Sequence, residues 1–258
     1  MILNGEIKVP VFGVVTDFTI HRWWVYPEIS HYFIAMDDLL STISNYGFFS
    51  LNVSSPGIPI REQFNRKFDR KELQVRYRLD PGRKTVLVMG GGAGVLPMEE
   101  IIKACDKSKV SLQYLVVCGN NKQLFKKIEL LKNRTESLIN VFGFVNYIAE
   151  LMAIADIIIS KPGGVSSSEA IASELPMIIF KPIPGQEEAN TRYLVNNRLA
   201  LRVQTFEELE SLLHELFSLE AETISVLKRN MLEKRRPHAA AEIVKFTVAY
   251  ASKTGAFG

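Results

Sequence analysis

The sequence of 258 residues predicts an α/β fold built around a doubly wound parallel sheet. Three observations lead to this prediction. From Thr85 onward, short apolar runs alternate with longer segments of helical character, which is typical of strands joined by crossover helices. The apolar runs are nearly continuous, as buried parallel strands are. Glycine-rich or polar turns follow several of these runs, at the strand ends where such sheets bind ligands.

The N-terminal part predicts a smaller α/β unit. Residues 8–17 form an apolar run suited to a strand in a sheet interior. Short strands are expected at 32–36 and 49–53, with a helix at 37–45 between them. The stretch 61–83 is highly charged, has no clear apolar period and ends in an Asp-Pro-Gly turn, so its latter part is interpreted as an interdomain linker.

Beyond residue 84 each apolar run predicts a strand, and each longer segment after a turn predicts a helix. The expected strands are 85–89, 112–118, 138–142, 157–160, 177–180 and 200–203. The expected helices are 97–106, 122–132, 146–155, 167–174, 188–196, 206–217, 222–235 and 239–251. We therefore expect an N-terminal remnant and linker at 1–80, a ligand-binding domain at 81–236, and a last helix at 237–258 that returns to the N-terminal part.

Composition narrows the class of protein. With 47% hydrophobic and 23% charged residues, the chain reads as ordinary globular protein, and a net charge of +3 is too small to indicate nucleic-acid binding. Cys105 and Cys118 lack metal-ligand spacing, which favours a reduced, cytosolic protein. No signal peptide and no apolar run of roughly 20 residues is apparent. Any membrane contact is therefore expected to be peripheral.

The strongest motif is KPGGVSSSE at 161–169, between a strand and a helix. A capping box with Ser166 as N-cap and Glu169 three residues later explains part of it. It does not explain Gly163, Gly164 and the run of serines. Backbone amides and hydroxyls at a helix N-terminus suit a diphosphate, so we favour an anion site.

A second motif, PGQEEAN at 184–190, follows the next strand. Acidic residues in the first turn of a helix explain the glutamates but leave Gln186 and Asn190 unexplained. Several amide and carboxyl groups together can hydrogen-bond the hydroxyls of a sugar. The two motifs side by side predict a nucleotide-sugar pocket.

Two further segments are weaker candidates. The glycine turn at 90–94, with Gly91 and Gly92, follows a strand but fits a dinucleotide fingerprint poorly, so a turn that lines a cleft is the favoured reading. Asp17 and His21 lie just past the first apolar run and are candidates for acid–base chemistry, although solvated loop residues are the more common case. The Arg-Trp-Trp segment after His21 and the basic cluster at 229–236 are candidates for contact with anionic lipid headgroups, although a solvated surface is the default interpretation of such charges.

In order, the chain carries VTD at 15–17, HRWW at 21–24, GIPI at 57–60, GGG at 90–92, GFV at 143–145, KPGGVSSSE and PGQEEAN. It resembles the processive diacylglycerol glucosyltransferases and monogalactosyldiacylglycerol synthases over nearly its whole length. These are GT-B glycosyltransferases, in which two Rossmann-like domains face each other across a cleft and the C-terminal one holds the nucleotide-sugar.

The resemblance implies a role for each polar residue of the pocket. The backbone of Phe144 and Val145 would meet uracil, and Glu169 the ribose hydroxyls. The helix start at Ser166, Ser167 and Ser168 would hold the diphosphate. Gln186 and Glu187 would bind the hexose, with Asn190 nearby. Neither metal nor cofactor is implied, because amides and the helix dipole take the charge of the departing UDP.

In the families that the chain resembles, several strands and a loop that carries a histidine precede the strand expected at residues 8–17. We interpret this sequence as lacking those elements. No catalytic base is therefore transferred, and Asp17 and His21 are the remaining candidates. The expected activity is transfer of a hexose from a UDP-sugar to a diacylglycerol-type lipid with inversion, in the cytoplasm at the inner face of the membrane. The alternatives are a UDP-GlcNAc transferase that acts on a lipid-linked peptidoglycan precursor, and a fragment that binds UDP-sugar without catalysis.

Overall fold

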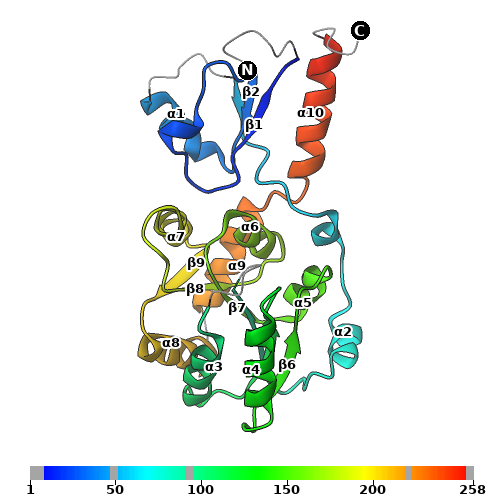
Figure 1. Cartoon of the computed structure of the whole chain (residues 1–258), viewed down its shortest axis with the longest axis vertical. Helices are drawn as coiled ribbons and strands as arrows, with labels where there is room; N and C mark the ends of the chain where they lie inside the picture. Colours follow the sequence, from blue (N-terminus) through cyan, green and yellow to red (C-terminus); the bar gives the residue numbers. More distant parts are fainter. Residues whose placement is uncertain (1–8, 47–51, 91–95, 219–221, 254–258) are drawn as a thin grey trace.

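The computed structural model describes residues 9–46, 52–90, 96–218 and 222–253 and contains two parallel sheets (Figure 1). The larger sheet has six strands in the order β6-β5-β4-β7-β8-β9. These are β4 (Lys84–Met89), β5 (Leu112–Val117), β6 (Leu138–Phe142), β7 (Ile157–Ser160), β8 (Met177–Phe180) and β9 (Ala200–Val203). The strand order reverses between β4 and β7, which is the switch point at which doubly wound sheets bind ligands.

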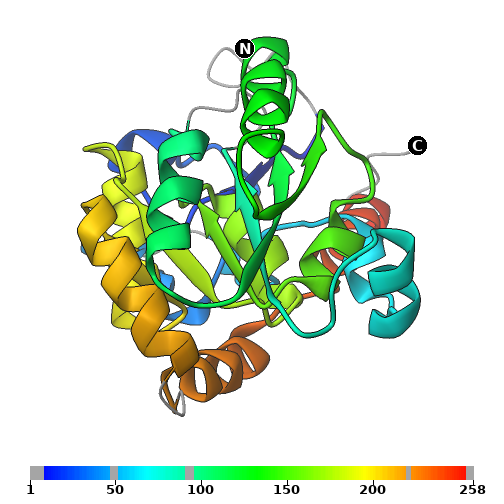
Figure 2. The same ribbon diagram turned by 90° about the horizontal axis from the view of Figure 1, so that it is seen from below.

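Side chains alternate between the two faces of the large sheet, and each face is covered by helices. Along β4, Val86 and Val88 pack against one layer, and Leu87 and Met89 against the other. The first layer comprises α3 (Met98–Lys107), α4 (Lys122–Lys132) and α8 (Phe206–Ser218). The second comprises α5 (Ile148–Ile154), α6 (Gly164–Ala172), α7 (Gln186–Asn196) and α9 (Glu222–Lys234). Figure 2 shows this arrangement from below.

The smaller sheet is formed by the N-terminal part, in the order β1-β2-β3. The strands of this sheet are β1 (Phe12–Val14), β2 (His31–Phe33) and β3 (Val53–Ser54). A 3-10 turn (Asp37–Leu39) and helix α1 (Leu40–Asn45) lie between β2 and β3 in the sequence. The last helix, α10 (Ala239–Lys253), lies beside this sheet, far in sequence from it (Figure 1). Phe246 of α10 contacts the rings of His31 and Phe33, with centroids 4.2 and 5.3 Å apart.

The two parts of the chain share one apolar core. Buried residues of the N-terminal part, such as Phe18 and Ile34, belong to the same cluster as Leu87 of β4 and Leu151 of α5. This shared cluster holds the end of β1 against the large sheet.

The strand predictions for the large sheet are confirmed, and those at 138–142, 157–160, 177–180 and 200–203 coincide with β6 to β9. Two expectations need correction. The charged stretch 61–83 contains α2 (Arg70–Arg76), which Asp69 caps and which Arg76 and Tyr77 join to Glu150 of α5. Helix α6 begins at Gly164, three residues before the expected start. The domain boundaries at 80/81 and 236/237 stay a prediction.

A search of the helices that the structure describes finds none with the length and apolar character needed to cross a membrane.

Candidate functional site

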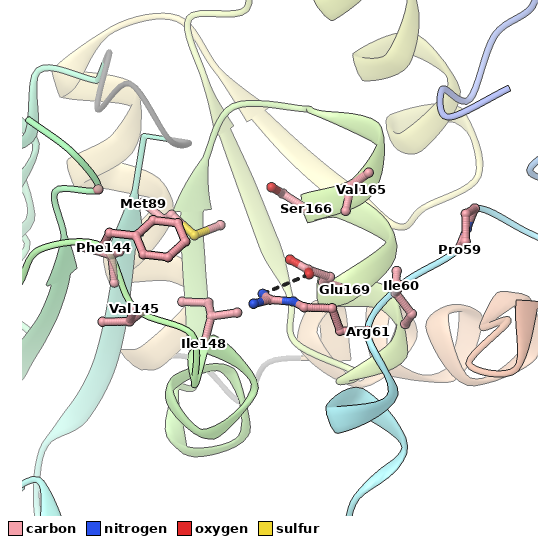
Figure 3. Close-up of a pocket in the computed structure, with 12 residues that line it drawn as sticks. Pro59, Ile60, Arg61, Met89, Phe144, Val145, Ile148, Val165, Ser166 and Glu169 are labelled. Carbon is pink, nitrogen blue, oxygen red and sulfur yellow. Dashed lines mark hydrogen bonds and ion pairs between the residues drawn. The ribbon is translucent and has the colours of Figure 1, made fainter. Parts of the chain in front are cut away.

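A cavity of about 590 Å³ lies at the switch point of the large sheet. It is lined by Pro59, Ile60, Arg61, Met89, Val117, Gly119, Phe144, Val145, Ile148, Val165, Ser166 and Glu169. Met89 and Val117 are the last residues of β4 and β5, so the cavity opens at the carboxyl ends of the strands. Figure 3 shows Phe144 and Met89 on one wall and α6 on the other. Phe144 is 69% exposed, so its ring is available to a ligand.

An ion pair lies at the α6 side of this cavity (Figure 3). Arg61 comes from the segment that enters the large-sheet half, and its Nη2 lies 3.2 Å from Oε1 of Glu169 on α6 (Figure 3). The Glu169 side chain is buried, whereas that of Arg61 is 47% exposed. Burial raises the pKa of the Glu169 carboxyl, and the nearby guanidinium opposes this shift. The site therefore offers one buried acceptor and one accessible cation.

The first two turns of helix α6 line the cavity through Val165, Ser166 and Glu169. Gly163 is the N-cap residue, and no side chain caps the helix, so the capping box centred on Ser166 is wrong. Ser166, in the first turn, lines the cavity. The N–H groups of the first turn have no partner within the helix, which leaves them free to bind an anion.

The other two serines of the motif lie outside the cavity lining. Ser167 is fully buried, and its hydroxyl faces Sδ of Met177 at 3.9 Å. Its N–H donates to the carbonyl oxygen of Gly163 at 2.8 Å. The expected diphosphate role of Ser167 is therefore corrected, because both of its donors point into the protein. Ser168 is half-buried and is not among the lining residues.

The start of α6 touches the end of the N-terminal strand segment. A Cβ atom on Gly164 would lie 1.9 Å from the carbonyl oxygen of Thr16 and 3.1 Å from Cα of Asp17. Only glycine fits at this contact. Gly163, by contrast, has nothing within 4 Å of a Cβ position.

The start of α7 carries the second motif. Gly185 has a φ of 103°, a conformation that favours glycine, and it lets the chain turn directly into the helix at Gln186. Glu187 folds back on its own loop, where its Oε2 accepts a hydrogen bond from the Ile183 N–H at 2.8 Å and lies 3.2 Å from Nζ of Lys161.

Asp17 joins this second motif. Its carboxylate accepts hydrogen bonds from the side-chain amides of Gln186 and Asn190, the latter at 2.7 Å. Asn190 also binds the backbone on both sides, accepting from the Phe18 N–H at 2.9 Å and donating to the Pro162 carbonyl at 3.1 Å. Asp17 and Asn190 are both buried, whereas Gln186 is exposed.

His21 lies elsewhere in the N-terminal part. Its Nδ1 accepts a hydrogen bond from the Trp23 N–H at 3.3 Å, and its ring lies 5.9 Å from that of Trp24. It lines a second cavity, of about 620 Å³, between the segment after β1 and α7. Gln186 and Tyr193 lie on the opposite wall of that cavity.

Of the residues predicted from the sequence, Phe144, Val145, Ser166 and Glu169 meet around one cavity. Gln186, Glu187 and Asn190 lie at the start of α7, and Asp17 contacts two of them. Gly91 and Gly92 lie outside the described residues. Arg61 and Gly119 were missed. The GIPI motif at 57–60, which directly precedes Arg61, was the sequence signal that could have identified Arg61. Gly119 follows the apolar run of β5 and has a φ of 58°.

The geometry thus defines a parallel-sheet domain with a ligand cavity at its switch point, faced by an uncapped helix. Solved structures with a similar fold include the following two. The crystal structure of Acinetobacter baumannii MurG matches with a TM-score of 0.67 at 17% identity, over 94% of this chain and 67% of that one. That of Os79 from O. sativa, in complex with UDP, matches with a TM-score of 0.63 at 17% identity, over 87% and 56%. The fold is of the GT-B glycosyltransferase type.

Sequence comparison places the chain within this class. The pattern of the glycosyltransferase family 28 C-terminal domain matches residues 85–245, and that of monogalactosyldiacylglycerol (MGDG) synthase matches residues 3–60. A processive diacylglycerol beta-glucosyltransferase from Bacillus licheniformis is 33% identical over 225 residues, which are 86% of this chain and 58% of the relative. The chain belongs to glycosyltransferase family 28. It spans little more than half the length of the curated relatives it matches.

Proposed function

We propose that this chain binds a UDP-hexose and takes part in transferring the hexose, with inversion, to a diacylglycerol-type lipid. The observation that carries the proposal is the cavity of about 590 Å³ at the switch point, in which Ser166 and Glu169 of α6 lie opposite Phe144 and Met89 (Figure 3). A volume of this size suits a small ligand. A cavity that combines an aromatic side chain, a buried carboxylate and a helix N-terminus matches the parts of a nucleoside diphosphate.

Each part of UDP has a matching partner on these walls. The exposed ring and backbone at Phe144 and Val145 suit the uracil base. The Glu169 carboxylate is an acceptor for ribose hydroxyls. Arg61 and the first turn of α6 supply positive charge for the diphosphate. The same groups stabilise the negative charge that develops on UDP as the bond to the hexose breaks.

The name of the Bacillus licheniformis relative supports glucose transfer to diacylglycerol. The structure of Os79 was solved with UDP, which supports UDP as the nucleotide. A diacylglycerol acceptor implies work at a membrane surface, so we also propose a peripheral association at the inner face of the cell membrane. Asp17 has both carboxylate oxygens engaged by amides, so it is not proposed as the base.

Calorimetric titration with UDP tests the donor site. The unaltered chain is expected to bind UDP, and Glu169→Ala is expected to weaken binding about tenfold or more, because hydrogen bonds to a charged group are worth roughly 1.5–3 kcal/mol. Glu72→Ala is the matched control, since Glu72 is 66% exposed on α2 and away from the cavity. No UDP binding, or equal binding by Glu169→Ala, would refute the donor site.

Transfer itself is tested by incubating the chain with diacylglycerol vesicles and UDP-glucose, UDP-galactose or UDP-GlcNAc. Glycolipid formed from UDP-glucose or UDP-galactose supports the proposal. Binding of UDP without any product would restrict the function of this chain to donor binding. Preference for UDP-GlcNAc would favour the alternative acceptor class, a lipid-linked peptidoglycan precursor.

A further inference from the structure

A buried carboxylate from the N-terminal part, that of Asp17, lies against the start of α7. It is not among the residues that line the cavity of about 590 Å³ at the switch point. Asp17 follows β1, whereas Gln186 and Asn190 belong to the large-sheet half, 169 and 173 residues further along the chain. The Asp17 side chain takes one amide donor on each oxygen. Asp17 is only 8% exposed, yet both of its carboxylate oxygens have a hydrogen-bond partner, as buried polar groups require.

We propose that Asp17 is a positioning residue that fixes the amide of Gln186 for the hexose of the donor. This inference rests on the proposed function. A carboxylate only accepts hydrogen bonds, so the amide group that faces Asp17 has to be the NH2 of Gln186. The carbonyl oxygen of Gln186 then points away from Asp17 as an acceptor for a sugar hydroxyl. Without Asp17, an exposed glutamine samples several rotamers and both amide orientations.

The surroundings make this arrangement rigid. Asn190 is 1% exposed and bonds to Asp17, to the Phe18 N–H and to the Pro162 carbonyl, so it ties the segment after β1 to the loop before α6. Gly164 allows that loop to approach Thr16 without a side chain between them. One buried cluster thereby joins the start of α6, which faces the nucleotide cavity, to the start of α7, which carries Gln186.

Asp17→Asn is the sharpest variant to test this role. The amide oxygen that it introduces still accepts from Asn190, whereas its NH2 group meets the NH2 of Gln186. The cluster around Asn190 is kept, and a bond to Gln186 forms only when the Gln186 amide turns over, which presents its NH2 group to the hexose in place of its carbonyl oxygen. Asp69→Asn is the matched control, because Asp69 is an exposed N-cap of α2 and asparagine caps helices equally well.

The quantity to measure is the ratio of the dissociation constant for UDP-glucose to that for UDP, by calorimetry on the full chain, with UDP-galactose as a second probe. Asp17→Asn is expected to raise this ratio about three- to tenfold, the range of one hydrogen bond, with UDP binding unchanged. Gln186→Ala sets the largest rise expected. Asp69→Asn should leave both constants unchanged.

Exchanging the carboxylate and the amide between positions 17 and 186 provides a test by rescue. In the double variant Asp17→Asn, Gln186→Glu, the amide at position 17 donates to the carboxylate at position 186, whose second oxygen faces the hexose as an acceptor. The ratio is expected to return toward that of the unaltered chain. Such a recovery is not expected if Asp17 serves only to hold the fold.

The outcomes separate this inference from the proposed function. Absence of UDP binding by the unaltered chain would refute both. Normal UDP binding with the same ratio in Asp17→Asn and the unaltered chain would refute the positioning role alone. Equal weakening of UDP and UDP-glucose binding, with a lower melting temperature, would assign Asp17 a purely structural role and overturn the inference.

Discussion

At the scale of single residues, Glu169 is expected to favour ligand binding while its buried charge lowers the stability of the folded protein. Glu169 is 6% exposed, and burial raises the pKa of its carboxyl despite the guanidinium of Arg61. A carboxyl with a raised pKa binds more protons in the folded than in the unfolded protein. Its contribution to the free energy of unfolding therefore falls as the pH rises from the ordinary glutamate pKa through the raised one. The buried charge therefore costs more stability at neutral pH than at pH 4.

Glu169→Gln removes this charge and keeps the shape of the side chain. We expect its melting temperature to be a few degrees higher than that of the unaltered chain at pH 7 and equal to it at pH 4. We expect its affinity for UDP to be about tenfold lower. Thermal unfolding at both pH values and calorimetry measure the two effects. Glu72→Gln, at an exposed carboxylate, serves as the control, and a lower melting temperature for Glu169→Gln at pH 7 would mean that the ion pair with Arg61 outweighs burial.

At the scale of elements, the start of α6 determines how closely this helix can approach the segment after β1. A side chain at position 164 has no space, because the carbonyl oxygen of Thr16 would lie 1.9 Å from its Cβ. Position 163, one residue earlier, is open and has an extended backbone with φ of −66°, which any residue adopts. Two adjacent glycines of one motif thus serve different purposes.

We expect Gly164→Ala to reduce the free energy of unfolding by about 1–3 kcal/mol, the usual cost of forcing an extra carbon into a packed site. Gly163→Ala should be nearly neutral. Urea unfolding of the two variants measures the difference. Equal stabilities would contradict the close contact between α6 and the segment after β1.

Much of the large sheet could be predicted from the sequence, because β7 and β8 are uninterrupted apolar runs with polar or glycine-containing turns behind them. The start of α6 was misplaced because Ser166 and Glu169 imitate a capping box, and the true N-cap is a glycine that carries no side-chain signal. Helix α2 escaped prediction because Leu73 is its only buried residue within the described structure, too few to create an apolar period.

The candidate site could be predicted only in part. Phe144, Ser166 and Glu169 follow successive strands, and strand ends of a parallel sheet meet at one edge, so their proximity follows from the pattern. The contact of Asp17 with Gln186 joins residues 169 apart, through two loops whose approach depends on the packing of both halves. No local periodicity records such a contact. Arg61 likewise reaches Glu169 from a charged segment without a pattern.

At the scale of the whole molecule, the N-terminal part contributes to the proposed donor site at two points. Residues 59–61 line the cavity at the switch point, and Asp17 bonds to Gln186 at the start of α7. The same part exposes aromatic side chains: Trp23 is 77% exposed and Tyr26 is 55% exposed, next to Arg22. Aromatic rings beside a cation suit the interface of an anionic membrane.

We expect the chain to sediment with vesicles that contain one third phosphatidylglycerol, and less with pure phosphatidylcholine, with weaker binding at high salt. Trp23→Ala should reduce the bound fraction several-fold. Val75→Ala is the control, because Val75 is a similarly exposed apolar residue, at 79%, on α2. Equal loss in both variants, or binding independent of lipid charge, would contradict an interface at Trp23.

The position of α10 has a consequence for the order in which the protein forms during synthesis. Phe12 and Phe33 leave the ribosome roughly 200 residues before their aromatic partners Phe246 and Tyr250. At about 5–20 residues per second, this interval lasts roughly 10–40 s. The six strands from β4 to β9 are complete before α10 emerges. The aromatic side chains of β1 and β2 therefore stay without their partners on α10 until after the strands of the large sheet have been made.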